Sequence, residues 1–344
     1  MRFHAHAAAP MTADDPRAAQ RIAWTRTALG GDAVALERAS MDAGFRSYWR
    51  TLGSGPSRIV MDSPPDKEDV RPWLRIHDLL AAGGVRVPAV LARDADHGFL
   101  LLEDLGTRTL LQAIDAGNAD AWFDAALDQL LRLQAIPPPA DLPAYDEALL
   151  ARELRLFDEW FLGRHLGLAL DCGALETLDL AYRRLIDAAL AQPRMLVHRD
   201  FMPRNLMPLA DGALAVLDFQ DAVRGPIAYD VLSLFKDAFL SWPEERVAGW
   251  IARYHARALD AGLPVPPLER FRRDADWIGV QRHLKVIGIF ARLHHRDGKP
   301  KYLQDVPRFF AYLDDVLPRY REFDGLRALI TERVRPALAA RASA

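Results

Sequence analysis

The chain has 344 residues, of which 50% are hydrophobic and 26% are charged, with a net charge of −3. This length exceeds one comfortable hydrophobic core and predicts two lobes. The near-neutral charge points to neither a nucleic-acid nor a membrane-surface partner, and the chain lacks the run of about 18 apolar residues that a membrane-spanning helix needs. Cys172 is the only cysteine, which excludes an intrachain disulfide and is typical of a reducing cytoplasm.

The first third of the chain predicts a small lobe built on a sheet. Residues 1–11 lack the apolar core of a signal peptide, and we expect a flexible tail there. A helix from Asp14 to Leu29 follows, and Gly30-Gly31 ends it. Short stretches bounded by turn residues then predict an antiparallel sheet that contains one helix between its third and fourth strands: Val34–Ala39, Phe45–Thr51, Arg58–Asp62, the helix Val70–Ala82, Val87–Ala92 and Gly98–Leu102.

The later two thirds are mostly helical. Proline clusters at 137–139 and 264–267 separate the helical segments. The predicted helices are Asp120–Gln134, Asp146–Leu166, Ala174–Ala191, Tyr229–Phe239, Pro243–Ala261, Leu268–His295, Tyr302–Leu317 and Leu326–Ala340.

Between the third and fourth of these helices the chain forms a polar loop and a hairpin. The apolar strand that begins at Leu196 breaks into His198-Arg199-Asp200, and Asn205 closes the loop. Asp211-Gly212 is a turn dipeptide, so Asn205–Pro208 and Ala213–Leu217 should pair as a hairpin that ends on Asp218. Two carboxylates and an amide can then converge on one point.

His-Arg-Asp followed by Asn five residues after the Asp is the catalytic-loop pattern of kinases, and its residue types suit phosphoryl transfer. A carboxylate at Asp200 can orient the attacking hydroxyl and accept its proton. The Asn205 amide and the Asp218 carboxylate are hard oxygen ligands for Mg²⁺. His198 suits a brace of the loop. The alternative is turn chemistry, in which these side chains cap the backbone.

This segment, together with Gly225-Pro226-Ile227-Ala228-Tyr229-Asp230, resembles the aminoglycoside phosphotransferase and choline kinase-like family. The resemblance implies an α+β, protein kinase-like fold with an N-lobe at 12–102, a hinge at 103–106 and a helical C-lobe at 107–344. It also implies ATP and Mg²⁺ as cofactors and Asp230 as a brace of the catalytic loop. No Asp-Phe-Gly or Ala-Pro-Glu motif follows Asp218, so a small-molecule kinase is favoured over a protein kinase.

Nucleotide contacts are less clearly marked. In the family, backbone groups of the hinge meet the adenine, which implies Glu103 and Leu105; a buried edge strand before a turn is the alternative. Arg46, Ser47 and the amides of the turn 40–44 could cover phosphates, although this turn could also be an ordinary hairpin. The strand Arg58–Asp62 lacks the phosphate-binding Lys of kinases: Met61 or Asp62 stands there. Either Arg46 or Arg50 replaces it, or triphosphate binding depends more on Mg²⁺.

The acceptor site is predicted from a basic segment. Residues 265–301 carry nine Lys and Arg against four acids, a charge unsuited to a polycationic aminoglycoside. At helical spacing, one face of the helix carries Trp277, Gln281, Lys285, Gly288 and Arg292. These residues suit a sugar with an anionic substituent, whereas a solvated cationic face is the alternative. We expect Lys285 or Arg292 to bind that substituent, with Arg46, Arg282 and His283 as the next candidates.

Within the family, the chain most resembles the sugar kinases of bacterial cell-wall recycling that phosphorylate the anomeric hydroxyl of N-acetylmuramate and N-acetylglucosamine. The segments that carry this closer likeness are 45–50, 59–65, 281–285 and 296–301. It implies an amino-sugar acceptor and makes the missing Lys a subfamily trait. The alternatives are a kinase of an aminoglycoside or a choline-like alcohol, and an inactive nucleotide-binding regulator. The oligomeric state cannot be inferred.

Overall fold

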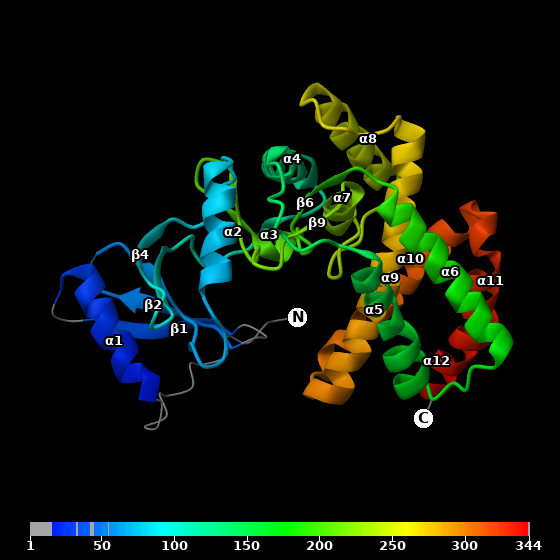
Figure 1. Ribbon diagram of the computed structural model, residues 1–344, viewed down its shortest axis with the longest axis horizontal. Helices are drawn as coiled ribbons and strands as arrows, with labels where there is room; N and C mark the ends of the chain where they lie inside the picture. Colours follow the sequence, from blue (N-terminus) through cyan, green and yellow to red (C-terminus); the bar gives the residue numbers. More distant parts are fainter. Residues whose placement is uncertain (1–15, 32–33, 42–44, 54, 343–344) are drawn as a thin grey trace. The chain divides into compact units, whose positions relative to one another are not determined.

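The computed structural model describes residues 16–31, 34–41, 45–53 and 55–342 (Figure 1). The expected tail and residues 42–44 of the turn 40–44 lie outside these ranges. The chain forms two compact units, Met1–Arg108 with Met207–Gln220, and Thr109–Leu206 with Asp221–Ala344. The predicted hairpin therefore belongs to the first unit and not to the helical one.

The first unit contains the predicted antiparallel sheet. Its five strands follow the order β1-β2-β3-β5-β4, and every neighbouring pair is antiparallel. The fourth strand starts later than predicted, because Pro88 has no N–H to donate to a neighbouring strand. The strands are β1 (Ala35–Met41), β2 (Ser47–Leu52), β3 (Arg58–Asp62), β4 (Val90–Asp94) and β5 (Phe99–Glu103).

Helix α1 (Pro16–Leu29) covers one face of this sheet. Its Trp24 and Ala28 pack against a buried cluster of Trp49, Val60 and Leu101. Burying these apolar surfaces fixes the helix on the sheet. Side chains alternate between the two faces of a strand, so Asp62, two residues after Val60, also faces α1, while Met61 faces the opposite side.

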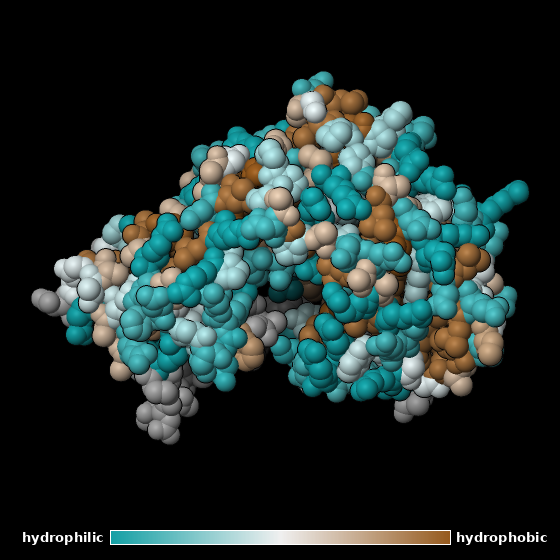
Figure 2. Space-filling view, in the orientation of Figure 1, coloured by the Kyte–Doolittle hydropathy of each residue, from teal (hydrophilic) through white to brown (hydrophobic). Residues whose placement is uncertain are grey.

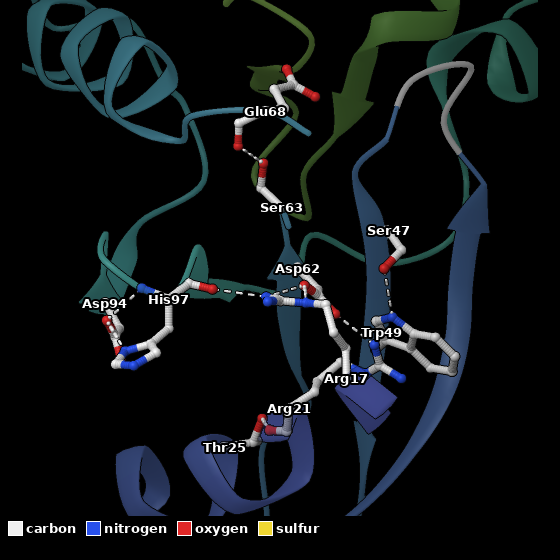
Figure 3. A network of polar contacts seen from close by, with 10 residues as sticks. All are labelled: Arg17, Arg21, Thr25, Ser47, Trp49, Asp62, Ser63, Glu68, Asp94 and His97. Atoms are coloured by element: carbon white, nitrogen blue, oxygen red, sulfur yellow. Dashed lines mark hydrogen bonds and ion pairs between the residues drawn. The ribbon is translucent and has the colours of Figure 1, made fainter. Parts of the chain in front are cut away.

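The carboxylate of Asp62 is buried and receives two arginines from α1 (Figure 3). Arg17 donates to Oδ1 from Nε at 2.9 Å, and Arg21 donates to Oδ2 from Nη1 at 2.6 Å. The Arg21 guanidinium also lies over the Trp49 ring, 3.8 Å from its centroid. A buried charge requires such pairing, so Asp62 is committed to anchoring α1.

Helix α2 (Arg71–Ala82) and the hairpin complete the first unit. The hairpin consists of β7 (Leu206–Pro208) and β8 (Leu214–Val216), as predicted, and Gly212 turns it with φ of +82°. The Val216 N–H donates to the Arg86 carbonyl at 2.7 Å, and the Phe219 ring lies 5.0 Å from that of Trp73. These contacts explain why the hairpin groups with the sheet.

The second unit is mainly helical, as predicted. It contains a two-stranded antiparallel sheet. Its first strand, β6 (Arg194–Val197), precedes the loop, and its second, β9 (Val223–Pro226), follows the hairpin. The α-helices are α3 (Leu110–Ala113), α4 (Ala119–Ala135), α5 (Glu147–Leu156), α6 (Cys172–Leu190), α7 (Ala228–Phe235), α8 (Glu244–Asp260), α9 (Leu268–Asp297), α10 (Val306–Val316), α11 (Asp324–Leu329) and α12 (Arg335–Ala342).

Short 3₁₀ and π segments join these helices, and π segments divide two helices that we predicted as continuous. The predicted helix 326–340 is α11, η6 and α12. Residues 146–166 form α5 and then the π-helical η1. The other segments are likewise brief. The full set is η1 (Phe157–His165), η2 (Pro203–Asn205), η3 (Pro300–Asp305), η4 (Leu317–Arg319), η5 (Arg321–Phe323) and η6 (Ile330–Val334).

The long helix α9 is the centre of the second unit, with α5, α6, α7 and α10 packed around it (Figure 1). A Cβ at Gly288 would lie 2.3 Å from the backbone carbon of Leu156, so this glycine permits the close approach of two backbones. Because α9 is buried on several sides, its middle is not the solvated cationic face that the sequence left open as the alternative. Gln281 and Lys285, from the face predicted to bind the acceptor, are buried.

Hydrophilic residues cover most of the face seen in Figure 2, with apolar residues scattered among them. None of the helices in the described part of the chain is long and apolar enough to cross a lipid bilayer.

Candidate active site

The loop after β6 has a strained backbone that a buried carboxylate holds in place. Arg199 has φ of +75°, a left-handed conformation that costs a non-glycine residue about 1–3 kcal/mol. Asp230, in the first turn of α7, accepts the His198 N–H at 2.7 Å and the Arg199 N–H at 3.0 Å. Asp230 is fully buried, so both bonds are shielded from water.

Further bonds within the loop fix the backbone of Asp200. Its N–H donates to Nδ1 of the buried His198 at 3.2 Å, and its carbonyl accepts Nδ2 of Asn205 at 2.9 Å. The Asn205 atom that would bind a cation is therefore its oxygen. His198 and Asp230 thus make the contacts expected of braces, while Asp200 is only partly buried and carries its carboxylate on a fixed backbone.

A second buried carboxylate, Glu153 on α5, holds the side chain of Arg199. Its Oε1 lies 2.7 Å from Arg199 Nη2 and 2.8 Å from Lys285 Nζ on α9. Its Oε2 accepts the Tyr145 hydroxyl and Gln281 Nε2. Burial alone would raise the pKa of Glu153, but the cations Lys285 and Arg199 outweigh it and hold the pKa below its ordinary value. Glu153 therefore stays charged and ties the loop to α9.

Lys285 is thus part of this buried network. Its ammonium also donates to the Tyr229 hydroxyl at 3.1 Å. Burial lowers the pKa of Lys285, but Tyr229 and Glu153 raise it above its ordinary value. We infer that Lys285 and Gln281 stabilise the loop 198–205 through Glu153. This contact explains why the two residues lie on one face of α9 without requiring that they bind the acceptor.

Asp218 lies at the end of the hairpin in the first unit. It is the second non-glycine residue with a left-handed backbone in the described part of the chain, with φ of +61°. Gln220 Nε2 donates to its Oδ1 at 2.7 Å. Strained residues concentrate at functional sites, and the two here are a neighbour of the predicted catalytic base and a predicted metal ligand.

Of the two arginines considered for the missing lysine, Arg50 is engaged at the hinge. It donates to both carboxylate oxygens of Asp104, at 2.6 and 3.0 Å, and Ser57 adds a third bond. Burial opposes ionisation of Asp104, but these bonds and the Gly106 N–H lower its pKa to about 2. Arg50 therefore holds the hinge segment.

Arg46 is the other arginine predicted as a substitute for the lysine. It is 8% exposed and pairs with Glu68 at 3.0 Å, just before α2. Ser63 donates to the Glu68 carbonyl at 2.9 Å and fixes the segment that carries this glutamate (Figure 3). A buried cation held by a carboxylate near a helix reproduces the kinase Lys–Glu ion pair in chemistry, with Met61 in the lysine's place on β3. Ser47 begins β2 beside it and accepts a bond from Trp49 Nε1 at 2.9 Å.

The predicted hinge residues separate by role. The Glu103 carboxylate binds Arg86 at 2.5 Å and the Ala89 N–H at 3.1 Å. The bond with Arg86 is the main cause that lowers its pKa. Its side chain is therefore committed, and only backbone groups of Glu103 and Leu105 are candidates for adenine.

The remaining residues predicted for the acceptor lie in different surroundings. Trp277 is buried against the rings of Tyr320 and Phe323. Arg292 lies near the end of α9, where burial and Arg296 lower its pKa. Neither contacts the Glu153 network in the structure.

Arg282 and His283 lie in a buried polar cluster that is not satisfied internally. Arg282 Nη1, both ring nitrogens of His283 and Oδ1 of Asp237 are buried without hydrogen-bond partners among the described residues. Burial raises the pKa of Asp237, whereas the nearby cations Arg282 and Arg204 lower it. Buried polar atoms are rarely left unpaired, so this cluster fits an absent polar ligand. Arg204 belongs to the loop 198–205 and lies close enough to Asp237 to affect its pKa, so the loop and this cluster are neighbours.

Sequence reasoning missed Glu153, Asp237 and Glu68. A signal existed for Glu153 alone, because it falls on the apolar stripe formed by Leu150, Leu154 and Phe157. Asp237 and Glu68 lie outside regular helices, where no periodicity marks either carboxylate.

Asp230 predicts a measurable pH dependence of stability. Burial raises the pKa of its carboxyl group to about 6 from 3.8, so between these values the folded protein binds more protons than the unfolded chain. The free energy of unfolding therefore falls as pH rises through this window. Relative to Asp230→Asn, which cannot titrate, we expect the wild type to lose about 1.3 kcal/mol between about pH 5 and pH 7 in urea denaturation. A constant difference between the two proteins would contradict this.

Solved structures share this fold. An ADP-bound aminoglycoside phosphotransferase matches with a TM-score of 0.58 at 15% identity, over 86% of this chain and 97% of that one. A choline kinase from Streptococcus pneumoniae matches with a TM-score of 0.59 at 14% identity, over 87% and 99%. At such identities the likeness shows the kinase-like fold alone, and it confirms the predicted fold class.

Sequence comparison gives closer relatives. Two proteins named N-acetylmuramate/N-acetylglucosamine kinase are similar: one from Pseudomonas putida, 53% identical over 90% of each chain, and one from Pseudomonas aeruginosa, 50% identical over 92% of this chain and 97% of the other. A third of that name, from Neisseria meningitidis, is 44% identical over 90% and 94%. The model of the phosphotransferase enzyme family matches residues 35–272. The chain therefore belongs to the phosphotransferase enzyme family and is a small-molecule kinase.

Proposed function

We propose that the protein transfers the γ-phosphoryl group of ATP to the anomeric hydroxyl of N-acetylmuramate and N-acetylglucosamine. The observation that carries this proposal is the name shared by relatives up to 53% identical over most of both chains, combined with the intact catalytic loop. Because the chain resembles the sugar kinases of bacterial cell-wall recycling, we assign the protein to that process in the cytoplasm.

In this reaction Asp200 orients the acceptor hydroxyl and accepts its proton. The strained loop bonded to Asp230 supports this role, because it fixes the backbone from which the carboxylate extends. The oxygen of Asn205 and the carboxylate of Asp218 are the proposed ligands of Mg²⁺, and a hard cation prefers such donors. When bound, Mg²⁺ neutralises phosphate charge.

Arg46 is the proposed phosphate-binding cation, with Glu68 as the residue that positions it. Ser47 and the backbone groups of its turn add neutral donors. Backbone groups of Glu103 and Leu105 are the proposed partners of the adenine. The ion pairs of the Glu103 side chain with Arg86 and of the neighbouring Asp104 with Arg50 support this, since they fix the segment on which these backbone groups lie.

For the acceptor, we assign the buried cluster of Arg282, His283 and Asp237. The muramate acceptor carries a lactyl carboxylate that N-acetylglucosamine lacks, and a guanidinium can bind it through two parallel bonds. The unpaired Nη1 of Arg282 supports this assignment over Lys285, which already has a carboxylate partner. Trp277 and Gln281 then support the acceptor region less directly, and Arg292, near the end of α9, is assigned no contact with the acceptor.

The substrate class is tested by measuring ADP release with a panel of acceptors. N-acetylmuramate and N-acetylglucosamine should be turned over in the presence of Mg²⁺, whereas kanamycin and choline should not. Turnover of kanamycin or choline without turnover of the amino sugars would overturn the proposal. Nucleotide binding without any turnover would instead indicate an inactive regulator.

Replacing Asp200 by Asn should lower kcat by about 10²–10⁴-fold, because the amide cannot accept the proton of the acceptor. ATP affinity, measured by calorimetry, should stay within about twofold, since the role assigned to Asp200 is toward the acceptor hydroxyl. Near-wild-type turnover of the variant would show that another group is the base.

Replacing Arg282 by Gln should lower kcat/KM for N-acetylmuramate more than for N-acetylglucosamine. Losing one charge-assisted bond to the lactyl carboxylate costs about 1.5–3 kcal/mol, or one to two powers of ten in kcat/KM. The ratio of kcat/KM for the two sugars is the readout, because loss of fold lowers both together. Lys285→Met should lower kcat/KM for both sugars to the same extent. Arg292→Gln is the matched control and should leave the ratio of the two values unchanged. A selective loss of kcat/KM for N-acetylmuramate in Lys285→Met or Arg292→Gln, but not in Arg282→Gln, would show that Arg282 does not bind the lactyl carboxylate.

A further inference from the structure

Three histidines meet where the end of α9 passes η1. His165 is the last residue of η1, and His294 and His295 lie in the last turn of α9. One ring nitrogen from each lies within 4.8 Å of the others. The two elements are 130 positions apart in the sequence, so only the fold brings these rings together.

The spacing of these nitrogens is that of metal ligands. Nδ1 of His165 lies 3.3 Å from Nε2 of His295. A tetrahedral Zn²⁺ with Zn–N bonds of about 2.0–2.1 Å separates its nitrogen ligands by about 3.3–3.4 Å. The third member, His294, has its Nδ1 buried without a hydrogen-bond partner among the described residues.

A hydrogen bond between His165 and His295 is the alternative explanation of the short distance. It accounts for two of the rings but leaves Nδ1 of His294 unpaired, whereas a metal ion satisfies all three. The ring of His294 contacts both of the others, at centroid distances of 6.0 Å from His165 and 4.5 Å from His295. The cluster is therefore a unit of three.

The donor set decides which metal would bind. Three imidazoles and no carboxylate suit Zn²⁺ and related transition metals, whereas Mg²⁺ prefers oxygen ligands. Arg341 and Arg164 lie close enough to affect these rings, and their charges reduce the affinity. His295 is exposed and His165 is buried, so a metal can enter from solvent and reach the interior.

We propose that His165, His294 and His295 bind one Zn²⁺ ion, with water as the fourth ligand. The ion would join η1 to the end of α9 and so stabilise the helical unit. Its three-nitrogen chemistry differs from that of the Mg²⁺ ligands assigned above, and the site does not depend on the proposed sugar substrate.

The test uses full-length, metal-free protein whose purification tag has been removed, titrated with Co²⁺ as a spectroscopic substitute for Zn²⁺. The wild type should bind one ion with the visible absorption of tetrahedral Co²⁺, and Zn²⁺ should displace it. His295→Asn, at an exposed position that folding should tolerate, should weaken binding at least about tenfold, as should His294→Asn. His97→Asn, an exposed histidine of the first unit, is the control and should bind as the wild type does.

Zn²⁺ should also raise the Tm of the wild type and of His97→Asn, but not that of His295→Asn, because a ligand stabilises only a state that binds it. Mg²⁺ should cause no such shift through this site. The absence of saturable Co²⁺ binding, or equal binding by the wild type and His295→Asn, would overturn the proposal.

Discussion

The conformation of the catalytic loop depends on two buried carboxylates. Asp230 holds the N–H groups of His198 and Arg199 and keeps a left-handed backbone that would otherwise relax. Glu153 holds the Arg199 side chain and ties it to Lys285 on α9. Removing one partner of a buried ion pair typically costs about 3–5 kcal/mol, which exceeds the cost of the strained residue. The position of Asp200 is therefore stabilised by buried contacts in the interior of the helical unit, and not by the loop itself.

The same principle organises the first unit, where charges also decide which residues can serve the nucleotide. Asp62 is committed to Arg17 and Arg21, and Arg50 to Asp104. Arg46, with Glu68, is the cation whose setting matches that of the absent lysine. On the proposed assignment, the cation missing from β3 is supplied by the residue just before β2.

Local patterns were sufficient to predict the hairpin and the antiparallel sheet, because turn residues and strand alternation act within a few positions. The division of labour on α9 was not predictable in this way. Helical spacing correctly grouped Gln281 with Lys285, but the sequence does not show that Glu153, more than 120 positions earlier, meets them in the interior. The same holds for Asp237 beside Arg282 and for His165 beside His295. Pairings of this kind depend on tertiary packing, which no periodicity encodes.

The most direct measurement of this dependence is amide hydrogen exchange in peptides that cover residues 198–205. Glu153→Gln leaves Arg199 and Lys285 without their shared charge, and exchange in the loop should accelerate by about tenfold or more while exchange in α6 stays as in the wild type. Glu159→Gln, on the exposed side of η1, is the matched control and should leave the loop unchanged. Unchanged loop exchange in Glu153→Gln would contradict the view that this buried network holds Asp200, the proposed catalytic base, in place.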